Sequence, residues 1–217
     1  MKEEIISNIE NNFRNEVKSN KKVKNAHLLV HSNKLGVHLN FAEGSMACLG
    51  QPNHLASVGK LFTSTIVSIL QEEGVLNFDD KIINYLDEDI VSKIHIYKRK
   101  DYSSEIKIKH LLNQTSGLND VFYHLLKKIV DNPKMEITTR EAILWGKENL
   151  KTKNRPGEKH FYTDTNYYLL GLIIERVTKK HFYEVMHELI FEPLKMNHAY
   201  MRSEEHTSEL QSHSDLV

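Results

Sequence analysis

The sequence lacks the features that would point to a disulfide-bonded, membrane-spanning or nucleic-acid-binding protein. Its single cysteine, Cys48, excludes an internal disulfide and is in keeping with a reducing compartment. No apolar stretch approaches the roughly 20 residues that a membrane-spanning helix needs. The 29 basic and 29 acidic residues give a formal net charge of zero, so we expect neither nucleic acid nor an acidic membrane as a partner.

The two ends of the chain carry different signals. The start, Met1 to Asn8, has no apolar core of the kind found in signal peptides, so the protein as written is expected to be cytoplasmic. Residues 202–217 resemble the codon-by-codon translation of a widely used sequencing adapter, and we expect this tail to be non-native. The fold prediction therefore treats residues 1–201 as one partial domain and sets the tail aside.

Apolar spacing predicts a mixed α+β protein. With 40% apolar and 27% charged residues in 217, the chain has the composition of an ordinary globular protein with a proper core. Apolar residues recur at helical spacing in several segments, and a hairpin of alternating residues lies near the start. The predicted helices are residues 3–20, 57–73, a short one ending near Leu86, 138–150 with Thr138 or Thr139 as its cap, 166–179 and 182–191. The predicted strands are residues 26–31 and 36–42.

Histidine is common in the chain, but its placement does not predict a metal site. Of the 13 histidines, His27 and His31 have the i, i+4 spacing of many metal ligands, yet both fall in a predicted strand. Scattered surface histidines explain the count better than a metal centre does. We therefore predict no metal and no cofactor.

Ser57 and Lys60 form a Ser-x-x-Lys motif at the start of a predicted helix. Residues three apart share a helix face, so the lysine amine is expected beside the serine hydroxyl. The first turn of a helix also presents free N–H groups and a positive dipole end, which favour negative charge. A nearby base and a stabilised oxyanion are what a nucleophilic serine needs. The motif alone is common by chance, so its weight depends on the rest of the chain.

Three further segments give the motif its context. They are Gly74 to Lys81, Ile108 to Leu118 (with Thr115-Ser116-Gly117 as a structural turn), and Pro156 to Tyr167. Together with Ala56 to Lys60, these segments resemble, in the same order, four stretches of the serine β-lactamase and penicillin-binding-protein superfamily, in its class C β-lactamase-like branch. The resemblance covers roughly residues 25 to 201.

This resemblance implies a β-lactamase/transpeptidase-like fold, with an antiparallel sheet flanked by helices and a helical subdomain. It also implies a serine hydrolase that works through an acyl-enzyme on an amide, ester or β-lactam in a small molecule or peptide. Ser57 corresponds to the nucleophile, and Lys60 and Tyr162 to the residues that share the general-base role. β-Lactamase, D-alanyl-D-alanine carboxypeptidase and esterase chemistry all stay open, as does a non-catalytic binding or sensor protein of the same fold.

The chain departs from the family pattern at two points. The second motif, usually Tyr-x-Asn, is Tyr162-Thr163-Asp164 here. Asp164, at the substrate-binding position, accepts hydrogen bonds but cannot donate one, and its charge favours a protonated Lys60. The third motif, Lys-Thr-Gly or His-x-Gly on a late strand, has no counterpart before Met201. We therefore expect a C-terminally truncated and inactive form of a longer parent protein.

Overall fold

The computed structural model describes residues 2–47, 49, 54–132, 135 and 137–201. The chain divides into two compact units, Met1–Asn53 and His54–Val217. The predictions about Cys48 and about the tail, residues 202–217, lie outside the described residues. Among the helices that are described, none has the length and apolar content needed to span a lipid bilayer.

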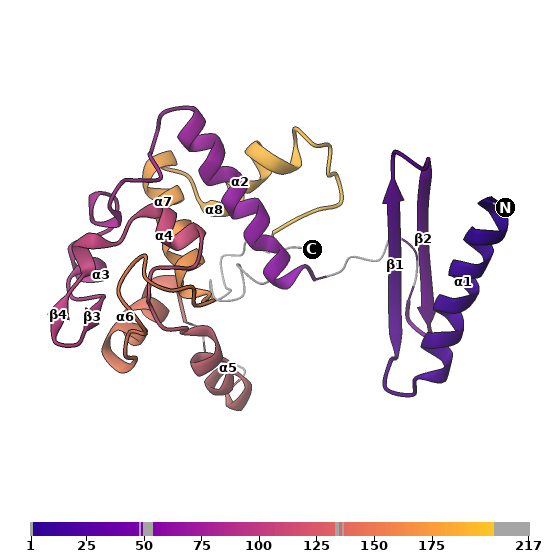
Figure 1. The fold of residues 1–217 in the computed structure, drawn as a ribbon, viewed down its shortest axis with the longest axis horizontal. Helices are drawn as coiled ribbons and strands as arrows, with labels where there is room; N and C mark the ends of the chain where they lie inside the picture. The colour runs from indigo at the N-terminus through magenta and orange to yellow at the C-terminus, as the bar shows by residue number, and fades with distance from the viewer. Residues whose placement is uncertain (1, 48, 50–53, 133–134, 136, 202–217) are drawn as a thin grey trace. The chain divides into compact units, whose positions relative to one another are not determined.

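The first unit is a β-hairpin with one helix alongside it (Figure 1). Helix α1 (Lys2–Ser19) is followed by the antiparallel strands β1 (Asn25–Ser32) and β2 (Val37–Gly44). The apolar face of the hairpin meets the helix, where the rings of Phe13 and Phe41 lie 6.4 Å apart. Arg14 adds an ion pair with Glu43 at 2.6 Å. The predicted helix and hairpin are confirmed.

The second unit is mainly helical and holds the whole candidate site. Short 3-10 turns and two-residue strands connect its helices. Its elements are the 3-10 turns Ala56–Val58, Ile82–Asn84 and Ser103–Glu105, strands β3 (Ile96–Tyr97) and β4 (Lys100–Asp101), helices α2 (Gly59–Glu72), α3 (Glu88–Val91), α4 (Ile108–Leu112), α5 (Phe122–Asp131), α6 (Thr139–Asn149), α7 (Thr165–Thr178) and α8 (Phe182–Met186), and a π-helical turn, His187–Phe191.

Helix α7 forms the centre of this unit. It contacts α2, α4, α6 and α8, and its residues Leu169, Leu170, Ile173 and Ile174 are completely buried. Each such side chain contributes about 1.5–3 kcal/mol by leaving water. Because Asp164 directly precedes α7, the core that fixes this helix also fixes the carboxyl end of the Tyr162-Thr163-Asp164 motif.

The start of the Ser57 helix differs from its prediction. The apolar pattern predicted a helix from Ser57, but Ser57 lies in a 3-10 turn and α2 begins at Gly59. Ala56 adopts a left-handed backbone with φ of 45°, and Val58 N–H donates to the Leu55 carbonyl at 3.0 Å. This tight turn replaces the first α-helical turn and presents the Ser57 side chain to solvent.

Other boundaries match the prediction closely, but the sheet is small. Thr138 caps α6 in a capping box with Glu141, and α7 begins one residue before its predicted start. The predicted short helix near Leu86 is a 3-10 turn, and α3, α5 and the β3–β4 pair were not predicted. The α+β class holds, although the described strands form two two-stranded antiparallel pairs rather than one broad sheet.

Candidate active site

Ser57 and Lys60 meet as their spacing predicted. Lys60 lies in the first turn of α2, and its Nζ donates to Ser57 Oγ at 3.4 Å. Ser57 is exposed, whereas the Lys60 side chain keeps 16% of its surface exposed. The hydroxyl is therefore open to a substrate, and the amine beside it is largely shielded from water.

Tyr162 joins this pair from a distant part of the chain. Its hydroxyl donates to Ser57 Oγ at 2.8 Å across 105 residues of sequence. Lys60 Nζ lies 5.1 Å from the centre of the Tyr162 ring and 5.5 Å from that of Tyr167. Two proton-carrying groups thus converge on one serine oxygen, with the lysine charge held against aromatic faces.

Asp164 forms an ion pair with Lys60, and its side chain is also only 16% exposed. Burial acts to lower the Lys60 pKa, but the hydrogen bonds and charges of Asp164 and Tyr162 outweigh it, so the net pKa is raised above that of an ordinary lysine. The predicted effect of Asp164 on Lys60 is confirmed. Lys60 is consequently an ammonium ion at neutral pH. The predicted role of Asp164 in substrate binding stays a prediction.

Asp120 holds the backbone of the second motif, a role that the sequence did not reveal. Its Oδ1 accepts from Asp164 N–H at 2.8 Å and from the Thr163 hydroxyl at 3.1 Å. Its Oδ2 accepts from Tyr123 N–H at 3.1 Å, at the start of α5. The carboxylate is buried, and each of its oxygens accepts at least one hydrogen bond. No local signal could have found this role, since the partner segment lies 44 residues away.

The turn Thr115-Ser116-Gly117 is structural, as predicted. The Ser116 side chain is fully buried, and its hydroxyl donates to Asn166 Oδ1 at 2.6 Å. Gly117 has φ of 79°, and its carbonyl accepts from Lys153 N–H at 2.8 Å. The turn therefore connects the start of α7 to the segment around Lys153.

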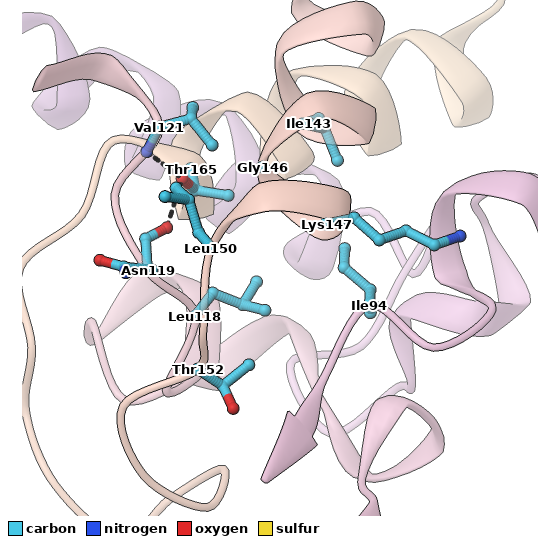
Figure 2. Close-up of a pocket in the computed structure, with 10 residues that line it drawn as sticks. All are labelled: Ile94, Leu118, Asn119, Val121, Ile143, Gly146, Lys147, Leu150, Thr152 and Thr165. Carbon is cyan, nitrogen blue, oxygen red and sulfur yellow. Dashed lines mark hydrogen bonds between the residues drawn. The ribbon is translucent and has the colours of Figure 1, made fainter. Parts of the chain in front are cut away.

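A small cavity of about 20 Å³ is lined by α6 and by the loop that holds Leu118, Asn119 and Val121 (Figure 2). Its lining is mostly apolar and comes from α6 and from loop residues such as Leu118 and Val121. Thr165 Oγ1 accepts from Val121 N–H at 3.1 Å and donates to the Asn119 carbonyl at 2.8 Å, which closes one wall. The volume suits about one water molecule, so this cavity is a packing feature and not a substrate pocket.

Metal-binding chemistry finds no support in the part of the chain that is described. There, no three histidine, cysteine, aspartate or glutamate side chains come together in a way that could hold an ion. His31 and His38 do meet across the hairpin, with their Nδ1 atoms 3.2 Å apart, as an exposed cross-strand pair.

Residues 51–215 match the family model described as Beta-lactamase, and the chain belongs to this family of serine hydrolases. Protein flp of Staphylococcus aureus (strain MW2) is 31% identical over 158 residues, which cover 71% of this chain and 29% of flp. The chain thus spans less than a third of the length of this relative.

Solved structures share the fold at lower sequence identity. The octameric penicillin-binding protein homologue from Pyrococcus abyssi has a TM-score of 0.75 at 22% identity, covering 97% of this chain and 50% of that one. The D-amino acid amidase from Ochrobactrum anthropi SV3, complexed with L-phenylalanine amide, has a TM-score of 0.70 at 19% identity, covering 94% of this chain and 56% of that one. The β-lactamase/transpeptidase-like fold is therefore confirmed.

Proposed function

We propose that this chain carries the acylation site of a serine hydrolase whose nucleophile is Ser57. The observation that carries the proposal is the convergence of two groups on one oxygen: Tyr162 OH at 2.8 Å and Lys60 Nζ at 3.4 Å from Ser57 Oγ. A serine hydroxyl is a weak nucleophile until a neighbour removes its proton. The substrate class is an amide, ester or β-lactam in a small molecule or peptide.

Tyr162 is the proton acceptor in this proposal, because Asp164 keeps Lys60 charged. As a phenolate, Tyr162 takes the Ser57 proton while Oγ bonds to the carbonyl carbon, and the Lys60 ammonium stabilises the phenolate charge. The phenol then protonates the departing amine or alcohol, leaving the acyl group on Ser57. Water attacks this ester by the same proton route, which releases the acid and restores the serine.

The oxyanion that forms on the substrate needs donors as well. The Ser57 N–H supplies one of them, and in the family a late strand carrying the third motif supplies the other. No counterpart of that motif precedes Met201 in this chain. We therefore propose that turnover needs the intact parent, meaning a longer chain that contains these residues together with the third motif. The 217 residues alone are expected to be inactive toward nitrocefin and p-nitrophenyl esters.

A fluorophosphonate probe on the intact parent tests the nucleophile. The probe should attach to Ser57, identified by peptide mass spectrometry, and Ser57→Ala should abolish the labelling. Because Ser64 also carries a hydroxyl within α2, Ser64→Ala is a matched control that should still be labelled at Ser57. Absence of label on Ser57 in a folded protein overturns the assignment.

A non-catalytic binding protein of the same fold is the second candidate, favoured by the Lys60–Asp164 ion pair. A lysine engaged in this way is a poor base, and an acceptor-only Asp164 cannot donate to a substrate carbonyl. The same labelling experiment separates the two candidates, since a binding protein would hold a ligand at the Ser57 site without forming a covalent adduct.

A further inference from the structure

Gln114 accepts hydrogen bonds from the backbone on both sides of Tyr162. Phe161 N–H donates to the Gln114 main-chain carbonyl at 2.8 Å, and Thr163 N–H donates to Gln114 Oε1 at 3.0 Å. We propose that Gln114 is the positioning residue that holds the Tyr162 hydroxyl against Ser57. This inference rests on the proposed function of the Ser57 site, and Gln114 itself takes no part in the chemistry.

The orientation of the Gln114 amide follows from its neighbours. Oε1 also accepts from Asn166 Nδ2 at 2.7 Å, and Asn166 Oδ1 accepts from the Ser116 hydroxyl at 2.6 Å. The Ser116 oxygen in turn accepts from Leu118 N–H at 3.1 Å, which leaves its proton free for Asn166. A flipped Gln114 amide would set its NH2 group against two donors. The oxygen must therefore face Thr163.

Two features of Gln114 cost stability and indicate that its acceptor oxygen is needed. Its backbone has φ of 61°, a left-handed conformation that is unfavourable for a residue with a Cβ. Its side chain is 6% exposed, and Nε2 has no hydrogen-bond partner among the described residues. A buried amide with an unpaired donor is unfavourable unless the other half of the amide is required.

Tyr162 depends on this backbone support because its own side chain is not enclosed by the core. The residue is 45% exposed, whereas its neighbour Thr163 is fully buried. Backbone bonds at Phe161 and Thr163, beside those that Asp120 accepts, thus help to fix where the phenol lies. A displacement of about 1 Å in a reacting group can cost about 100-fold in rate, so losing one of these bonds should be visible in catalysis.

Gln114→Met in the intact parent removes the acceptor while keeping the length of the side chain. The rate of fluorophosphonate labelling at Ser57 should fall by about 100-fold, and the Thr163 amide should exchange with solvent about tenfold faster. Gln114→Glu keeps an oxygen at the same reach and should retain most of the amide protection. The matched control is Gln71→Met, because Gln71 Oε1 likewise accepts from a backbone N–H, that of Phe78 at 2.7 Å. It should not change the labelling rate.

A double-mutant cycle with Tyr162→Phe separates positioning from general damage. If Gln114 acts through Tyr162, Gln114→Met should slow labelling in the wild-type background and have almost no further effect in Tyr162→Phe. Equal effects in both backgrounds overturn the inference while leaving Ser57 as the nucleophile. If the wild type is not labelled, the proposed function fails. Exchange of the Thr163 amide then tests by itself whether Gln114 holds this segment. A Thr163 amide that exchanges in the wild type as fast as exposed loops excludes the role of Gln114, whether or not the variants fold.

Discussion

The ammonium group of Lys60 is paired with the carboxylate of Asp164, two residues beyond the tyrosine whose hydroxyl contacts Ser57. The pairing fixes the charge of the lysine and couples it to the position of the second motif. A single substitution at Asp164 should therefore change the protonation state of Lys60 directly.

Asp164→Asn should move the alkaline limb of the pH–rate profile to lower pH. The Lys60 pKa is raised in the folded protein because Asp164 and Tyr162 outweigh the opposing effect of burial. Without the carboxylate, the pKa falls and Lys60 loses its charge at a lower pH. In the proposed mechanism the Lys60 ammonium stabilises the charge on Tyr162, so activity should decline there too. The profile of kcat/KM in the intact parent, or of probe labelling, gives the measurement.

A shift of the acid limb instead of the alkaline limb would identify Lys60 as the base. If neutral Lys60 takes the serine proton, Asp164→Asn will shift the acid limb to lower pH and increase the rate near neutrality.

The same substitution should also change how the free energy of unfolding depends on pH. A raised lysine pKa stabilises the fold below the pKa of the unfolded chain, and this contribution is lost as pH rises through the folded value. Asp164→Asn should therefore reduce the alkaline loss of stability.

Asp120→Ala should destabilise the fold and slow acylation together. It removes the acceptor for Asp164 N–H, the Thr163 hydroxyl and Tyr123 N–H, of which the first two lie on the second motif. Leaving buried donors unpaired costs about 1–3 kcal/mol each, so urea unfolding should show a loss of at least about 2 kcal/mol. Asp131→Ala changes an exposed acid at the end of α5, the helix that begins two residues after Asp120, and should change the free energy of unfolding by less than about 0.5 kcal/mol. Equal effects of the two variants would contradict the role of Asp120.

Local patterns predicted those parts of the fold that local physics decides. The apolar spacing of α7, the alternation of the β1–β2 hairpin and the threonine cap of α6 all act within a few residues. The meeting of Ser57 with Lys60 belongs here too, because three residues along a helical turn bring two side chains together. The exact start of helix α2 could not be predicted, because the apolar pattern does not reveal the left-handed backbone of Ala56.

The supports of the site could not be predicted in this way. Gln114 and Asp120 accept backbone N–H groups from Thr163 and Asp164, and these bonds cross 49 and 44 residues of sequence. A side chain that bonds to a distant backbone follows no periodicity and has no fixed spacing. The family resemblance placed Tyr162 near Ser57, but only the folded chain shows which residues hold it there.

Gly117→Ala should cost more stability than Gly74→Ala, although both glycines have left-handed backbones, with φ of 79° and 71°. The conformation alone costs an alanine about 1–2 kcal/mol. A Cβ on Gly117 would also lie 2.1 Å from the Asn154 carbonyl oxygen and 2.8 Å from His95 Nε2, whereas no described atom lies within 4 Å of one on Gly74. Urea unfolding should therefore give a loss above about 2 kcal/mol for Gly117→Ala. Similar losses in the free energy of unfolding for both variants would show that the turn at Gly117 moves to accommodate the Cβ.

His95 should make the fold sensitive to acid. Its ring is fully buried, and Nε2 donates to the Asn154 carbonyl at 2.9 Å, since a carbonyl can only accept. Burial lowers the His95 pKa despite these contacts, so the folded protein holds the ring neutral. The unfolded chain binds the proton more readily. Stability is therefore complete above the ordinary histidine pKa of about 6.5 and falls below it, with a limiting slope of about 1.4 kcal/mol per pH unit for one proton.

His95→Gln isolates this contribution, because glutamine keeps an N–H donor and does not titrate. Urea unfolding between about pH 5 and 7.5 should show a shallower pH dependence in the variant than in the wild type. Burial also lowers the His110 pKa, so part of the wild-type slope will remain. His160→Gln, which changes an exposed ring, is the control and should leave the slope as it is. An unchanged slope in His95→Gln would mean that the ring binds a proton as readily in the folded state as in the unfolded chain, although its buried Nδ1 has no hydrogen-bond partner among the described residues.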